Sequence, residues 1–69
     1  MRPEKVRPGQ TWSLTRLIKG RKMNVIVCVL HVNGFTARAL ILYSEDPEMV
    51  AGQKDLLSTT WIVEGSLLS

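Results

Sequence analysis

The fold is decided by residues 23–44, which read MNVIVCVLHVNGFTARALILYS. Apolar and β-branched residues dominate on both sides of Asn33-Gly34, and an Asn-Gly pair between two such runs is a strong signal for a β-hairpin. We therefore predict a long hairpin with a two-residue turn at Asn33-Gly34, in which both residues take positive φ. In this register Val32 pairs with Phe35, which fixes the partner of every other residue in the hairpin.

This register sorts the side chains of the hairpin onto two faces, because successive residues of a strand point to opposite sides of a sheet. The first face is apolar almost throughout and is assigned to the core. It carries Ile26, Cys28, Leu30, Val32, Phe35, Ala37, Ala39 and Ile41, and it ends with Asn24 and Tyr43. The second face is apolar away from the turn and polar beside it. It carries Met23, Val25, Val27, Val29, Leu40 and Leu42, and near the turn His31, Thr36 and Arg38.

The apolar part of the second face needs a cover, because a two-stranded ribbon that is apolar on both sides is not stable in water. Two explanations remain open. Either the rest of the chain closes over this face to form a tight barrel, or another molecule covers it. The residues of this candidate protein interface are Val25, Val27, Leu40, Leu42, Leu56 and Leu57.

The segments that flank the hairpin supply further strands. Trp12 and Leu14 alternate with polar residues over residues 11–15, which predicts a first strand there. Whether Leu17 and Ile18 extend this strand is left open by the sequence. A charged turn is expected at residues 19–22, which read KGRK. A last strand is predicted over residues 59–64, where apolar side chains fall on both sides of an extended segment.

Shorter elements connect these strands. Residues 46–52 begin with Asp-Pro and end with glycine, so they fit either one helical turn or a loop. Residues 54–58 are interpreted as a one-turn helical link to the last strand. The whole pattern predicts an all-β fold, a small barrel of about five strands in one domain over residues 10–69. Residues 1–9 are expected to form an extended N-terminal arm.

The chain has one cysteine, Cys28, and one histidine, His31. No internal disulfide can therefore form, and an ordinary zinc site lacks its ligands. The two residues are three apart on a strand, so they face opposite sides of the sheet and cannot act together as nucleophile and base. We expect no enzymatic activity, no cofactor and no small-molecule substrate. Cys28 is interpreted as a core side chain in a reducing compartment.

Membrane insertion is not expected from the sequence. No apolar run approaches the roughly 18 residues that a membrane-spanning helix requires. The first residues are positively charged but are not followed by the apolar stretch of a signal peptide. We therefore expect a cytoplasmic protein.

Charge is distributed unevenly along the chain. Residues 1–38 hold eight of the nine Lys and Arg residues but only one of the six acidic residues. A concentration of basic residues of this kind predicts either contact with phosphate groups of a nucleic acid or a charged turn that keeps a small protein soluble. The candidate residues for a nucleic acid or an acidic partner are Arg16, Lys19, Arg21, Lys22 and Arg38.

The opening of the predicted domain resembles a known class of proteins. The motif Pro8-Gly9-Gln10-x-Trp12, followed by a short basic turn, a long hairpin, a one-turn link and a last strand, is similar to small SH3-like barrels of the KOW and Tudor type. Stand-alone proteins of this kind occur in bacteriophages and bacteria. The resemblance implies an SH3-like barrel that acts as a binding module, in the host cytoplasm if a phage encodes it.

These observations favour a non-catalytic binding module that docks onto a larger protein, as a phage or bacterial accessory or regulatory protein. A homodimer is the other way to cover the surplus apolar surface. The alternative function is electrostatic binding of DNA or RNA by the basic N-terminal half of the chain.

Overall fold

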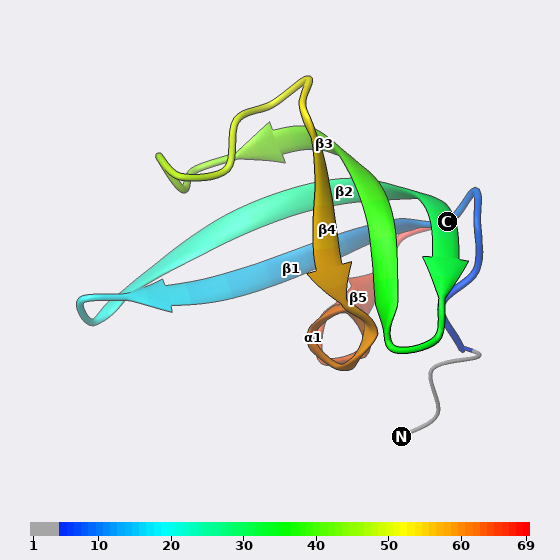
Figure 1. Ribbon diagram of the computed structural model, residues 1–69. Helices are drawn as coiled ribbons and strands as arrows, with labels where there is room; N and C mark the ends of the chain where they lie inside the picture. The colour runs from blue at the N-terminus through cyan, green and yellow to red at the C-terminus, as the bar shows by residue number, and fades with distance from the viewer. Residues whose placement is uncertain (1–4) are drawn as a thin grey trace.

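The computed structural model describes residues 5–69 and contains a five-stranded antiparallel sheet with one short helix. The elements are β1 (Thr11–Ile18), β2 (Arg21–Asn33), β3 (Thr36–Ser44), β4 (Lys54–Ser58), α1 (Thr59–Val63) and β5 (Ser66–Leu67). The strand order across the sheet is β4-β3-β2-β1-β5, with the long β2 and β3 in its middle (Figure 1). The predicted all-β fold class and the central hairpin are confirmed.

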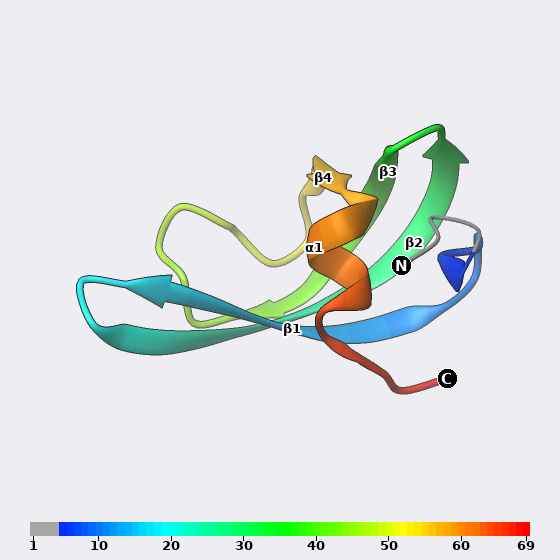
Figure 2. The ribbon, with the colours of Figure 1, turned by 90° about the horizontal axis from the view of Figure 1, so that it is seen from below.

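The sheet is strongly curved, and α1 lies on its concave side (Figure 2). The α-helix α1 has five residues, and residues 5–69 contain no helix of the length and apolar character that a membrane span requires.

The two hairpin turns use glycine in different ways. Lys19 and Gly20 join β1 to β2 with φ of 49° and 78°, so both central residues of this turn have the positive φ of a type I′ turn. The turn between β2 and β3 is Gly34-Phe35, one residue later than predicted, and its first central residue, Gly34, has φ of 62°. Glycine at that position is typical of a type II′ turn.

The register of the central hairpin therefore differs from the predicted one. Asn33 pairs with Thr36, and Val32 pairs with Ala37 instead of Phe35. The Thr36 hydroxyl donates a hydrogen bond of 3.0 Å to the carbonyl oxygen of Asn33, which closes the end of the hairpin. Phe35, predicted to lie in the core, is 70% exposed at the turn.

Two register shifts in the pairing of β2 with β3 decide which face is buried. They lie between Ile26 and Val27 and between Val29 and His31. A bulge adds one residue to one strand and so reverses which side chains of the two strands share a face. The face that becomes buried carries Val25, Val27, Val29, Ala37, Ala39 and Ile41, each at most 2% exposed.

The predicted assignment of β2 side chains to the two faces was consequently wrong for residues 25–30. Cys28 and Ile26, assigned to the core, are only half-buried on the opposite face, and Leu30 is 39% exposed. Val25 and Val27, expected to need a cover, are covered by the chain itself. For β3 the predicted core residues Ala37, Ala39 and Ile41 are buried as expected.

Segments from both ends of the chain complete the core. The side chains that pack with the buried face of the central hairpin are Val6, Trp12, Leu14, Met49, Leu57 and Ile62. Of the predicted N-terminal arm, residues 1–4 lie outside the described residues, whereas Val6 is 3% exposed and Gly9 donates a backbone hydrogen bond of 2.7 Å to Val29. Residues 46–52 form a loop, which is one of the two predicted alternatives.

The predictions for the last two elements were interchanged. Residues 54–58 form β4, because the free edge of β3 offers backbone groups to pair with them, from Thr36↔Ser58 to Leu40↔Lys54. Residues 59–63 form α1, in which Thr59 and Ile62 are both buried at the spacing of one helical face. The predicted helical link and last strand were therefore wrong at these positions.

We expect Gly65→Ala to destabilise the fold by about 1–3 kcal/mol, because a side chain at this position overpacks a closed contact. A Cβ atom on Gly65 would meet the carbonyl oxygen of Ser13 and lie 2.8 Å from Cδ2 of Leu14. The free energy of unfolding from urea denaturation measures the effect. Ser66→Ala, at the exposed neighbouring position, is the control, and equal stability of the two variants would contradict the expectation.

Candidate functional site

The convex face of the sheet carries an apolar surface that residues 5–69 leave uncovered. Its residues, which we call the outer patch, are Ile26, Cys28, Leu30, Leu40, Leu42, Tyr43 and Leu56. The pairing places them side by side: Cys28 pairs with Leu40, and Ile26 pairs with Tyr43. The outer patch therefore crosses β2, β3 and β4.

Most of the outer patch is accessible to solvent. Leu56 is 61% exposed, Leu42 and Tyr43 are each 48% exposed, and Leu30 is 39% exposed. Helix α1 and the loop that precedes β4 lie on the other, concave side of the sheet (Figure 2). The register shifts also bring Leu30 and both Leu42 and Tyr43 to the convex side.

The charged side chains that border the outer patch on β3 and β4 are basic. Lys54 pairs with Leu40, and Arg38 lies between His31 on β2 and Leu56 on β4. No Asp or Glu occupies an outward-facing position of β2, β3 or β4, strands that the structure describes in full. The outer patch thus combines apolar side chains with positive charge at its β4 side and near the β2–β3 turn.

Tyr43 lies at the end of the outer patch that is remote from this turn. Its hydroxyl donates a hydrogen bond of 3.2 Å to Oε2 of Glu45, while Oε1 of Glu45 accepts the backbone N–H of Asn24 at 2.8 Å. The hydrogen bond to Glu45 and the negative charge of this carboxylate raise the pKa of the Tyr43 phenol. The tyrosine ring is held in place at the rim of the patch.

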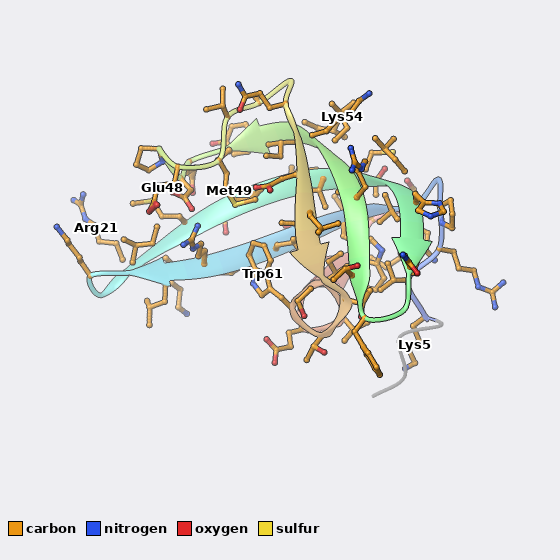
Figure 3. All side chains as sticks on the ribbon, in the orientation of Figure 1. Lys5, Arg21, Glu48, Met49, Lys54 and Trp61 are labelled. Atoms are coloured by element: carbon orange, nitrogen blue, oxygen red, sulfur yellow. The ribbon has the colours of Figure 1, made fainter. Side chains whose placement is uncertain are left out.

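The candidate basic residues do not form one site. Lys19, Arg21 and Lys22 are exposed at the end of the β1–β2 hairpin, which we call the basic tip. Arg21, at the β1–β2 turn, lies far from Lys54 at the start of β4 (Figure 3). Arg38 borders the outer patch, near the opposite end of β2.

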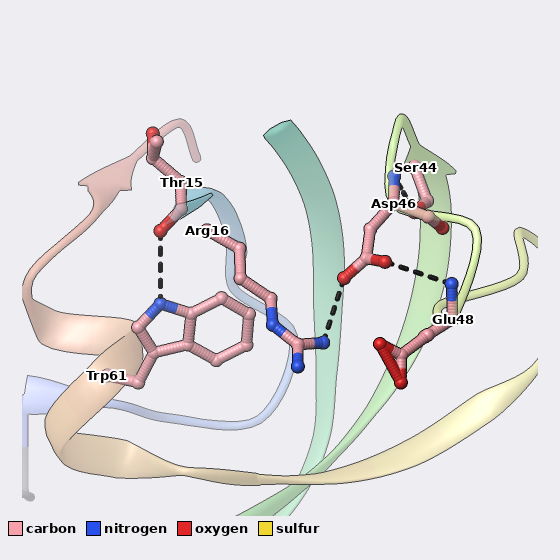
Figure 4. A network of polar contacts seen from close by, with 6 residues as sticks. All are labelled: Thr15, Arg16, Ser44, Asp46, Glu48 and Trp61. Carbon is pink, nitrogen blue, oxygen red and sulfur yellow. Dashed lines mark hydrogen bonds and ion pairs between the residues drawn. The ribbon is translucent and has the colours of Figure 1, made fainter. Parts of the chain in front are cut away.

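Arg16, the fifth candidate, is held on the concave side by a buried carboxylate. Its Nη1 lies 2.8 Å from Oδ2 of Asp46, whose side chain is fully buried, whereas the Arg16 side chain is 41% exposed (Figure 4). The other oxygen, Oδ1, accepts the backbone N–H of Glu48 at 2.9 Å. This ion pair connects β1 to the loop before β4 and leaves Arg16 with much of its charge already compensated.

A groove of about 510 Å³ opens beside this ion pair. It is lined by Arg16, Glu48, Met49, Asp55, Leu57 and Trp61. The indole of Trp61 is fixed by a hydrogen bond of 3.2 Å from its Nε1 to the carbonyl oxygen of Thr15 (Figure 4). The groove contains both signs of charge, so its lining does not single out one class of ligand.

The candidate protein interface is divided by the fold. Leu40, Leu42 and Leu56 belong to the outer patch, whereas Val25, Val27 and Leu57 are at most 7% exposed and belong to the core. The residues that were missed are Ile26, Cys28, Leu30 and Tyr43. No local sequence signal identifies them, because both faces of the hairpin are apolar and only the bulges distinguish the two.

We expect Glu45→Ala to lower the pKa of Tyr43 toward its ordinary value. The hydrogen bond in which the neutral phenol is the donor and the nearby negative charge both favour the protonated form, and the substitution removes both. Ultraviolet absorbance of the phenolate during alkaline titration reports the change directly, because the chain has one tyrosine. Glu48→Ala is the control, and a Glu45→Ala protein that titrates at the pH of the unsubstituted chain would contradict the assignment.

No protein-family model, curated protein or solved structure matches the chain. Within residues 5–69, no group of three or more His, Cys, Asp or Glu side chains is placed so that it could hold a metal ion. The outer patch and the basic tip are therefore the two surfaces on which a proposed function can rest.

Proposed function

We propose that the chain is a non-catalytic binding module that docks onto a larger protein through the outer patch. The observation that carries this proposal is the apolar convex face, which spans three strands and has no cover from residues 5–69. Contiguous apolar patches on a small protein are typical of interaction sites. A partner that is apolar where it meets Leu42 and Leu56 and acidic where it meets Arg38 and Lys54 complements this face in both respects.

Covering these side chains supplies part of the free energy that specific association requires. Complete burial of a leucine side chain stabilises a complex by about 1.5–3 kcal/mol. Leu56 is 61% exposed, so a partner can still supply more than half of this burial free energy at that side chain. Leu42 is 48% exposed, so a partner can supply about half of it there. Two such side chains at the middle of an interface can act as hot spots, since a few buried residues supply most of the binding energy.

The proposal includes an SH3-like barrel and a phage or bacterial accessory role in the cytoplasm. The order of elements supports it: a basic turn and a long hairpin come first, and a short helix, α1, directly precedes the last strand, β5. The resemblance to small SH3-like proteins rests on a similar order, although its link and last strand were predicted at residues 54–58 and 59–64, where the chain forms β4 and α1. Because one fold serves many functions, the choice of partner depends on the outer patch and not on the fold.

The double variant Leu42→Asp/Leu56→Asp should reduce partner capture at least tenfold, which corresponds to about 1.4 kcal/mol. The measurement is a pull-down from nuclease-treated bacterial lysate with quantitative mass spectrometry, using the full chain as bait. The matched control is Leu67→Asp/Leu68→Asp, because these leucines are 51% and 53% exposed in the C-terminal segment, away from the outer patch. Circular dichroism establishes that each variant folds.

Equal capture by the two double variants would contradict docking through the outer patch. Size-exclusion chromatography with light scattering accompanies the pull-down. A dimer that Leu42→Asp/Leu56→Asp dissociates would identify a second copy of the chain as the occupant and would overturn the proposal of a larger partner.

A second candidate function, binding of DNA or RNA, is favoured by the basic tip. Lys19, Arg21 and Lys22 are exposed together at the end of a hairpin that projects from the body of the sheet (Figures 1 and 3). Neither Lys19 nor Lys22 forms an ion pair with any residue of 5–69. Such a tip can reach the phosphates of a groove, and the resulting affinity would be mainly electrostatic.

If the basic tip binds nucleic acid, Lys19→Glu/Arg21→Glu should weaken binding at least tenfold in a mobility-shift assay. The slope of log affinity against log salt concentration should also become shallower, by the amount that corresponds to the loss of about two phosphate contacts. The double variant Arg38→Glu/Lys54→Glu has the same net charge and leaves the tip intact, so it is the control. Equal weakening by both double variants would show a nonspecific effect of net charge and would exclude the tip as a site.

A further inference from the structure

A pocket of about 260 Å³ lies at the end of the outer patch that is nearest the β2–β3 turn. It is lined by His31, Asn33, Thr36, Arg38 and Leu56, and we call it the hairpin pocket. Three neighbouring strands contribute, because His31 is paired with Arg38 and Arg38 is in turn paired with Leu56. The pocket therefore depends on the register shift after Val29, which sets His31 opposite Arg38.

The lining of the hairpin pocket supplies hydrogen-bond donors without competing acids. The side chains of His31 and Arg38 form no hydrogen bond or ion pair with other residues in the described part of the chain. Thr36 donates to the carbonyl oxygen of Asn33 at 3.0 Å, which holds the turn and leaves the side-chain amide of Asn33 free to donate. No Asp or Glu lines the pocket.

An apolar wall distinguishes this pocket from the other basic sites. Leu56, 61% exposed, forms one side and continues into the outer patch. Arg16, by contrast, already faces the buried Asp46 carboxylate. A ligand in the hairpin pocket can thus place a negative charge on Arg38 and an apolar group on Leu56 at the same time.

We propose that the hairpin pocket binds the carboxylate of an Asp or Glu on the docked protein, with an adjacent apolar side chain of that protein resting on Leu56. A guanidinium can hold a carboxylate with two parallel hydrogen bonds, so Arg38 is the principal contact, and His31 and Asn33 are additional donors. A protein is favoured over a nucleic acid because the phosphate backbone offers no apolar group for Leu56. This inference rests on the proposed function and adds the class of partner residue, an Asp or Glu, that the hairpin pocket recognises.

The test measures binding of short, terminally blocked peptides to the full chain by NMR titration of backbone amides. Three peptides alternate leucine with glutamate, glutamine or lysine. The glutamate peptide should bind at least tenfold more tightly than the glutamine peptide and should shift the amides of His31, Thr36, Arg38 and Leu56. Arg38→Glu should reverse the preference to the lysine peptide, whereas Lys19→Glu, the matched control at the basic tip, should leave the preference unchanged.

The inference is overturned if the glutamate and glutamine peptides bind equally, or if Arg38→Glu and Lys19→Glu have the same effect. Inorganic phosphate is titrated in parallel, and saturable binding of phosphate that is tighter than that of the glutamate peptide would make the pocket a phosphate site instead. Partner capture separates this inference from docking itself. If Leu42→Asp/Leu56→Asp abolishes capture and Arg38→Glu leaves it unchanged, docking stands and the carboxylate site is excluded.

Discussion

The irregular pairing between β2 and β3 sets the positions of the elements around it. Its register shifts turn Val25, Val27 and Val29 toward the same side as Ala37, Ala39 and Ile41, so the concave side of the sheet becomes one continuous apolar surface. Helix α1, the loop before β4 and the segment around Val6 then pack on this side, because it is where apolar area can be removed from water. The same shifts bring Leu30 and Leu42 to the convex side, where nothing from residues 5–69 covers them.

The fold also distributes the charge that is concentrated in the first part of the sequence. The basic tip and Arg38 lie near opposite ends of β2, a strand of 13 residues, so they form separate surfaces. Arg16 turns inward and is bound to Asp46, an acid from the second half of the chain. The five candidate basic residues thus lie in three different surroundings: a solvated tip, an ion pair beside a groove of mixed charge, and a pocket next to apolar side chains.

Several features could be predicted because local rules determine them. The central hairpin follows from β-branched residues around a glycine turn, and β1 follows from the alternation at Trp12 and Leu14, both of which are buried. The assignments of residues 54–58 and 59–63 could not be made in this way. Both segments have five residues and mix polar with apolar side chains, so neither shows a clear period. The edge of β3 and the space over the concave face decide that the first pairs as β4 and the second coils as α1.

By itself the sequence determined that this is a mostly β chain with a long central hairpin, without an internal disulfide, and with more apolar strand surface than the hairpin can bury alone. Only the tertiary structure decided which surface remains exposed. When both faces of a strand pair are apolar, a two-residue period does not distinguish them, and one bulge exchanges them. Val27 thereby entered the core and Cys28 came to the convex face beside Leu40, which is the surface from which the function is now inferred.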